Sequence, residues 1–329
     1  MLAQGKLLRN VLVMNMGMQL EDISASIYGK EISQLSKVQV FAVVVRMVKG
    51  LLETFIRNAG EKKFYFISTA FEKGIFLENN LMNLGIYETL EGVLAEKGQK
   101  ISELKDVEEE YIGKATSFEQ TSMNFFEEVG KRGLTSEAMG IRSIRNGKEQ
   151  SGGSSSYDVE KSWLEKLDVT YKVTLGDVAA KIFLYDMDVV AKKQEIFRLH
   201  LYDLEFEQEI LEQDKQIYYD YFLVNASVKQ ILQDMRNNKY DLRKMDEHAE
   251  IAFEGKYVAF VIPELIRIMV DEKAIPVEEA IEIVRKICGY GDFAMMAEAV
   301  NTCPPEYVEK LVPHLIEKMN NMEMKREDD

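Results

Sequence analysis

The sequence predicts a mixed α/β fold, and three observations support this prediction. Short segments with the alternation or aromatic content of β-strands are interspersed with segments whose apolar residues recur at helical spacing. No internal repeat breaks this succession, which favours a layered α/β fold. Hydrophobic residues make up 46% of the 329 residues and charged residues 29%, which suits a globular protein with a sizeable core.

The predicted elements follow one another along the whole chain. Strands are expected at residues 63–68, 138–142, 168–175, 179–185, 196–206 and 250–253. Helices are expected at residues 38–58, 74–97, 101–110, 118–131 and 218–235, and residues 20–35 are expected to be short helical or irregular structure. Three helical segments follow within residues 251–319, where Pro276 begins a helix and Gly289 ends it. The turn at Gly176 and Asp177 predicts that the two strands around it pair.

The charge balance and the cysteine count restrict the class of protein. Acidic residues outnumber basic ones by 56 to 41, so the net charge of −15 disfavours nucleic acid and acidic membrane surfaces as partners. Two cysteines, Cys288 and Cys303, are too few for a secreted disulfide framework. The most apolar stretch, residues 38–56, contains Arg46 and Lys49 and is expected to be a buried helix rather than a membrane span. The protein is therefore expected to be soluble and cytoplasmic.

The histidines predict no catalytic or metal-binding residue. His200, His248 and His314 are not spaced with one another as a metal-ligating pair. His200 lies in an alternating segment, which favours a strand residue over a general base.

Two groups of carboxylates leave alternatives open. Glu108, Glu109 and Glu110 could mimic the acid pair of a glycosidase, but a solvated helix end is the favoured interpretation. Asp186 and Asp188 could bind a cation, and a turn explains them equally well.

Several motifs recur in an order typical of one known family. Residues 262–271 read IPELIRIMVD, and residues 286–304 contain Cys288, Tyr290 and Pro304 at matching spacing. Upstream stand FYFISTAFEKGIFLENNLMNLGI at residues 64–86 and YDYFLVNASVKQILQDM within residues 218–235. Together with the GIR of residues 140–142 and the Tyr-Asp of residues 185–186, these segments resemble the α-glucan phosphorylases, which act on glycogen, starch and maltodextrin.

The resemblance implies a more specific architecture. It implies a Rossmann-like layered domain similar to the amino-terminal half of a glycogen phosphorylase, a glycosyltransferase of the GT-B type. Residues 1–329 are expected to form a single α/β domain, and residues 146–157, which include SGGSSS, a flexible surface loop. The family's carboxyl-terminal domain, whose Lys holds pyridoxal phosphate, is expected to be absent, so no cofactor is predicted.

The departures from the family's pattern carry the functional prediction. The family's glycine-rich loop corresponds to residues 110–128, where only Gly113 remains among the glycines. The family's NDTHP corresponds to residues 254–258 and its TNHT to residues 291–294, and neither is kept. Residues of a vestigial ligand cleft are predicted where the family meets its sugar substrate. They are Gly113, Lys114, Thr116, Gln120, Arg142, Lys256, Tyr257 and Asp292.

The resemblance and its departures together predict a non-catalytic phosphorylase relative. Such a protein would have a regulatory or scaffold role in glucan metabolism, with itself as a homo-oligomer or a glucan-metabolism protein as its partner. One alternative is an α-glucan-binding module. Another is an enzyme, as half of a split phosphorylase completed by another chain.

Overall fold

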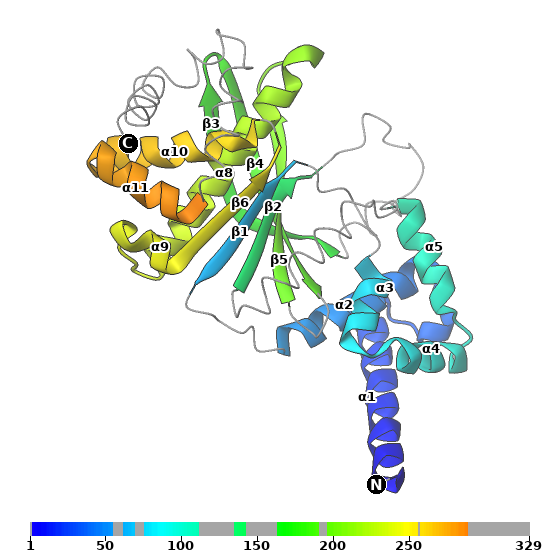
Figure 1. Ribbon diagram of the computed structural model, residues 1–329. Helices are drawn as coiled ribbons and strands as arrows, with labels where there is room; N and C mark the ends of the chain where they lie inside the picture. Colours follow the sequence, from blue (N-terminus) through cyan, green and yellow to red (C-terminus); the bar gives the residue numbers. More distant parts are fainter. Residues whose placement is uncertain are drawn as a thin grey trace.

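The protein is described here by a computed structural model. It describes residues 2–54, 62–69, 76–111, 135–142, 163–190, 196–255 and 257–288. One sheet lies between two groups of helices, which confirms the predicted α/β class (Figure 1). The predicted helix at residues 118–131, the loop at residues 146–157 and the last helical segment before residue 319 lie outside the described residues.

The sheet has six strands in the order β3-β4-β5-β2-β1-β6. The strands are β1 (Lys63–Ser68), β2 (Thr135–Ile141), β3 (Glu165–Leu175), β4 (Val178–Val190), β5 (Ile196–Phe206) and β6 (Ala249–Glu254). Strands β5, β2, β1 and β6 are parallel to one another, while β4 is antiparallel to both β3 and β5. The hairpin predicted at Gly176 and Asp177 is confirmed, with Gly176 at a φ of 56°.

One face of the sheet is covered by helices from the second half of the chain. These are α8 (Lys215–Asn237), α9 (Met245–His248), α10 (Val261–Arg267) and α11 (Val277–Cys288), and a π-helical turn at Ile268–Glu272 extends α10. Apolar side chains of these helices share one core with the sheet residues that point the same way, such as Tyr65 and Ile67. The carbonyl of Pro276 accepts the bond from the Ala280 amide, so this proline begins α11 as predicted.

Helices from the first half of the chain pack beside the other face, mainly where β4 ends and β5 begins, and the first of these helices extends away from the sheet (Figure 1). They are α1 (Leu2–Tyr28), α2 (Lys37–Thr54), α3 (Phe76–Leu84), α4 (Tyr87–Glu96) and α5 (Ile101–Tyr111). A second core joins them to sheet residues of the opposite orientation, such as Ala138 and Leu199. None of the helices in the described part of the chain has the length and apolar content needed to cross a bilayer.

Two predicted helical segments differ from the structure. The first helix runs from Leu2 to Tyr28, although residues 20–35 were expected to be short or irregular. The prediction missed it because α1 is stabilised by packing Met16 and Leu20 into the second core rather than by a clear local signal. The segment at residues 74–97 forms two helices, because Gly85 adopts a φ of 72° between them.

Candidate functional site

The chain reverses its direction of travel across the sheet beside β1. It passes from β1 to β2 and on to β5 on one side, and then returns to the other side of β1 to form β6. In open α/β sheets, ligands bind outside the carboxyl ends of the strands at such a switch point. The carboxyl ends of β1 and β6, at Ser68 and Glu254, are paired in register and therefore define the candidate site. We call the residues at these strand ends, together with Asp220, the switch-point edge.

Asp220 is the buried carboxylate of the switch-point edge. It projects from the first turns of α8 and accepts bonds from Gln216 Nε2 at 2.5 Å and from the Tyr257 amide at 3.3 Å. Burial raises the pKa of Asp220 to about 6, although hydrogen bonds from Gln216, Tyr257 and Thr69 act in the opposite direction. A carboxyl group with a pKa in this range is able to exchange a proton near neutral pH.

The backbone after β6 packs closely against the end of β1. Gly255 has a φ of 127°, and a Cβ atom there would lie 2.8 Å from Cγ2 of Val258 and 3.3 Å from Oγ1 of Thr69. The site therefore requires glycine for both its backbone angle and its lack of a side chain. Burial also raises the pKa of the neighbouring Glu254. The backbone at Gly255 therefore lies too close to Val258 and Thr69 to leave room for a side chain at this position.

The structure does not bring together the two predicted cleft residues that it describes. Nη1 of Arg142 lies 3.1 Å from Oδ2 of Asp203, and its guanidinium lies 4.5 Å from the ring centre of Tyr185. By strand alternation these partners point toward the core of α1–α5. Tyr257 instead packs against the core beneath α8, and its ring stacks on Phe260 at a centroid distance of 5.9 Å. Arg142 follows the carboxyl end of β2 and Tyr257 follows that of β6, so both lie at the carboxyl edge of the sheet. Their side chains, however, are on opposite faces of the sheet.

The remaining predicted cleft residues lie outside the described residues. They are Gly113, Lys114, Thr116, Gln120, Lys256 and Asp292. Their membership of a ligand cleft stays a prediction.

A continuous series of buried and partly buried ion pairs crosses the α8-facing side of the sheet, and the sequence alone did not indicate most of it. We call it the ion-pair chain. It runs in order through Asp234, Lys63, Glu137, His200, Asp186 and Arg198. Positive and negative groups alternate along it, and it joins α8 to β1, β2, β5 and β4. The available signal was a charged residue on the inward-facing side of an otherwise apolar strand, as at Glu137 in β2.

His200 is the centre of the ion-pair chain. Its Nδ1 lies 2.6 Å from Oδ1 of Asp186, and its Nε2 lies 3.1 Å from Oε2 of Glu137. Burial alone would lower the pKa of His200, but the two carboxylates raise it to about 9, so the imidazole is charged at neutral pH. Burial alone would raise the pKa of Glu137, but His200 and Lys63 lower it to about 2. His200 is a strand residue of β5, as predicted, and its charge is neutralised on both sides.

The interpretation of Asp186 and Asp188 as a turn is wrong. Both lie in β4, where their cationic partners are protein side chains. Nε of Arg198 lies 3.2 Å from Oδ1 of Asp188, and Nη1 lies 3.6 Å from Oδ2 of Asp186. Sequence alone missed this because the partners come from β5, across the antiparallel register.

The interpretation of Glu108 as part of a solvated helix end is also wrong. Its side chain is completely buried and accepts a bond from Nε1 of Trp163 at 2.7 Å. It also accepts bonds from the first amides of α3, at Phe76 and Leu77. The helix start has amides without helical partners, so a buried carboxylate from another helix satisfies them. Glu108 is a structural group.

Another buried carboxylate, Glu264, belongs to the IPELIR motif. Its Oε1 accepts bonds from Asn225 at 2.8 Å and from Nη2 of Arg267 at 2.9 Å, and its Oε2 accepts from Nε of Arg267 at 3.0 Å. The motif therefore fixes α10 against α8. Across the described ranges, no group of three or more His, Cys, Asp or Glu side chains is placed to hold a metal ion.

Comparison with known proteins connects this fold to one enzyme family. Residues 188–328 match the carbohydrate phosphorylase family. The chain is 25% identical to the maltodextrin phosphorylase of Streptococcus pneumoniae over 91% of its own length and 44% of the relative's. It is 23% identical to the glycogen phosphorylase of Bacillus subtilis over 89% and 45%, and 22% identical to the brain form from Bos taurus over 77% and 38%. The chain thus spans less than half the length of these relatives.

Proposed function

From the premise that this chain is similar to carbohydrate phosphorylases, we propose that it is a non-catalytic member of the α-glucan phosphorylase family with a regulatory or scaffold role in glucan metabolism. The proposal concerns the 329 residues of this chain. It separates the residues that build the fold from those that would contact a sugar or a phosphate.

The observation that carries the proposal is the contrast between the family-like residues and the replaced ones. Glu264 and Arg267, which match the family's pattern, are joined to Asn225 in a buried network between two helices. Tyr257, which replaces a residue of the family's NDTHP segment, turns its ring onto Phe260 and the core. This contrast supports retention of the fold with loss of the polar groups that would bind substrate.

The hydrogen bonds of Asp220 at the switch-point edge support the same proposal. Asp220 accepts its bonds from Gln216, Tyr257 and Thr69, all of which belong to the protein. A sugar hydroxyl arriving there would compete with these donors for the oxygens of one buried carboxylate. Buried polar groups lose free energy when a partner is removed, so displacement of a donor is unfavourable.

Pyridoxal phosphate, the cofactor that the resemblance implies for the family, does not suit Lys63. A lysine that forms a Schiff base must lose its proton readily. Burial alone would lower the pKa of Lys63, but Glu137 and Asp234 raise it above its ordinary value. The proposal therefore assigns no cofactor role to this lysine and no reaction step to the cofactor.

The test is phosphorolysis by the purified chain. It is incubated with maltoheptaose, inorganic phosphate and pyridoxal phosphate, and the release of glucose 1-phosphate is measured beside an active maltodextrin phosphorylase. We expect no release above the protein-free control. Release that scales with the concentration of the chain would contradict the proposal.

Two further measurements separate the alternative functions. Calorimetry with maltooligosaccharides is expected to give no heat of binding at millimolar sugar, whereas saturable heat would favour a glucan-binding module. Addition of the carboxyl-terminal half of a phosphorylase is expected to restore no activity, whereas restored phosphorolysis would favour a split enzyme. The regulatory role itself predicts that the chain recovers a glucan-metabolising enzyme from its native cell.

A further inference from the structure

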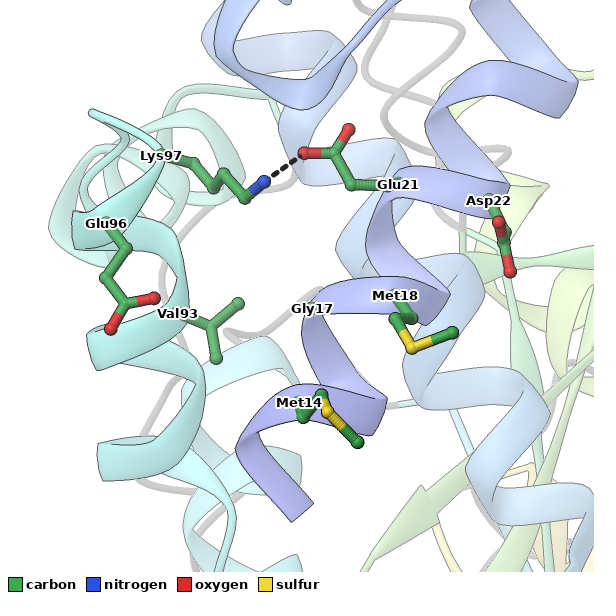
Figure 2. Close-up of a pocket in the computed structure, with 8 residues that line it drawn as sticks. All are labelled: Met14, Gly17, Met18, Glu21, Asp22, Val93, Glu96 and Lys97. Carbon is green, nitrogen blue, oxygen red and sulfur yellow. Dashed lines mark ion pairs between the residues drawn. The ribbon is translucent and has the colours of Figure 1, made fainter. Parts of the chain in front are cut away.

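A hollow of about 560 Å³ lies between α1 and α4, away from the sheet (Figure 2). It is lined by apolar groups from both helices and by acidic groups along its borders. The lining residues are Met14, Gly17, Met18, Glu21, Asp22, Val93, Glu96 and Lys97. The hollow is largely open to solvent, so it offers a surface for a partner rather than an enclosed pocket. We call it the α1/α4 groove.

Two methionines of the groove are exposed, whereas Val93 at its floor is buried. Met14 and Met18 stand one turn apart on α1, and each side chain is 59% exposed. Figure 2 shows Val93 pointing from α4 toward Gly17, whose missing side chain leaves the middle of the groove open. A Cβ atom on Gly17 would lie 3.7 Å from Cγ1 of Val93, an ordinary van der Waals distance, so an added methyl group would occupy the floor between the two helices. Exposed methionines adapt to partners of different shape, which suits a docking surface.

The polar border of the groove is predominantly acidic. Nζ of Lys97 is paired with Oε1 of Glu21 at 2.6 Å, which closes one end of the groove (Figure 2). Asp22 on α1 and Glu96 on α4 add two further carboxylates, one from each helix. With one lysine against three carboxylates, the lining has a net charge of −2. The whole chain carries a net charge of −15, so its field reinforces the local one.

We propose that the α1/α4 groove is a docking site for a basic amphipathic helix of a partner protein. Leucine-sized side chains on one face of that helix would fill the space over Gly17 and Val93 and contact Met14 and Met18. Lys or Arg residues beside this face would meet Asp22 and Glu96. A helix laid in a hydrophobic groove with matching charges is a common mode of peptide recognition. A second acidic copy of this chain is less favoured, because like charges repel. The inference does not depend on whether the chain is catalytic.

The test measures binding of a labelled helical peptide composed of Leu and Lys by fluorescence anisotropy with the full chain. The expected result is saturable binding that weakens as salt rises, while a peptide with Glu in place of every Lys does not bind. The double variant Met14→Ser/Met18→Ser is expected to bind about tenfold more weakly, since central apolar contacts dominate such interfaces. Met82→Ser is the matched control, because Met82 is 57% exposed but lies on α3 outside the groove.

A second pair of variants tests the charge complementarity. Glu96→Lys is expected to weaken binding of the Leu–Lys peptide severalfold, whereas Glu91→Lys makes the same charge change on α4 outside the groove and is expected to have a smaller effect. Methyl NMR of the 17 methionines is expected to show peptide-induced shifts for Met14 and Met18 and none for Met82.

Three outcomes would overturn the proposal. The first is equal affinity for the Leu–Glu peptide, and the second is an equal loss of affinity in Met82→Ser. The third is that Met14→Ser/Met18→Ser dissociates an oligomer of the chain without changing peptide affinity, which would assign the groove to a second copy. Thermal unfolding of each variant confirms that folding is retained, because the substituted side chains are exposed.

Discussion

The ion-pair chain and the switch-point edge lie on one sheet but treat buried charge in opposite ways. In the ion-pair chain, His200 lies between Asp186 and Glu137, and the pKa shifts of His200 and Glu137 keep both of these groups ionised at neutral pH. At the switch-point edge, Asp220 has hydrogen-bond donors but no cationic partner among the described residues. Burial therefore favours the neutral form of Asp220. The comparison shows that charged partners, rather than burial alone, decide whether the pKa of a buried carboxyl group is raised or lowered.

The difference also separates structural from functional candidates. A charge that is neutralised on both sides has little capacity left for a ligand. A carboxyl group whose pKa lies near neutrality responds to small changes around it. Asp220 is accordingly the titratable group to examine first at the carboxyl edge of the sheet.

The largest expected effect comes from breaking the ion-pair chain at its centre. His200→Leu leaves Asp186 and Glu137 without the cation between them, and we expect a loss of about 3–5 kcal/mol in the free energy of unfolding. Urea unfolding measures it. The control is Lys172→Ala, which removes an exposed partner of Glu207 and is expected to cost less than about 1 kcal/mol. Equal losses of unfolding free energy in the two variants would show that the ion-pair chain is not a centre of structural stability.

The next largest effect is the pH dependence of stability that His200 causes. The folded-state pKa of His200, about 9, lies above its ordinary value of 6.5. The stabilisation that protonated His200 contributes to the folded state is therefore fully present below pH 6.5. It is lost as the pH rises through about 9, which lowers the free energy of unfolding by about 3 kcal/mol. Urea midpoints across this interval should decline more steeply in the wild type than in His200→Gln. Parallel declines would contradict a charged His200 in the folded protein.

At the switch-point edge we expect the opposite response, a gain in stability on removing the charge. The folded-state pKa of Asp220 is raised from 3.8 to about 6, so its stabilising contribution is present below pH 3.8 and is lost as the pH rises through about 6. Asp220→Asn is therefore expected to be about 2–3 kcal/mol more stable than the wild type at pH 8, with little difference near pH 4. Thermal or urea unfolding at the two pH values decides the matter. A less stable variant at pH 8 would mean that the Asp220 charge is satisfied.

The smallest expected effect lies at Arg142, which follows β2 at the carboxyl edge of the sheet and points to the face opposite α8. Arg142→Met removes the pair with Asp203 and the contact with the Tyr185 ring, and we expect a loss of about 1 kcal/mol because the groups are only partly buried. A double-mutant cycle with Asp203→Asn measures the coupling. If Arg142→Met instead left stability unchanged and abolished sugar binding, the residue would belong to a ligand site.

Local sequence patterns were sufficient for most of the described fold. The bounds of β1 and β5 match the predicted segments at residues 63–68 and 196–206. Pro276 located the start of α11, and the hairpin turn at Gly176 was recognised from its residue types. Each of these signals acts over a few residues, which is why a single sequence contains them.

The candidate sites were much less accessible to sequence analysis. Glu108 looked like one member of an exposed acidic run, and its burial depends on Trp163 and the start of α3. Asp220 gave no signal, because its environment is built by Thr69 and Tyr257 from distant parts of the chain. Of the predicted cleft, only Arg142 and Tyr257 fall within the described residues, and the two point to different faces.

The sequence by itself determined the α/β class, most element positions and the resemblance to α-glucan phosphorylases, because these depend on residue type, spacing and order. Only the tertiary structure decided which charges are paired, which carboxyl groups are buried and where an apolar surface stays exposed. Lys63, Glu137 and His200 are far apart in the chain and meet only because their strands are neighbours in the sheet. Charge pairing and burial depend on distances in space, which the order of residues along one chain does not reveal.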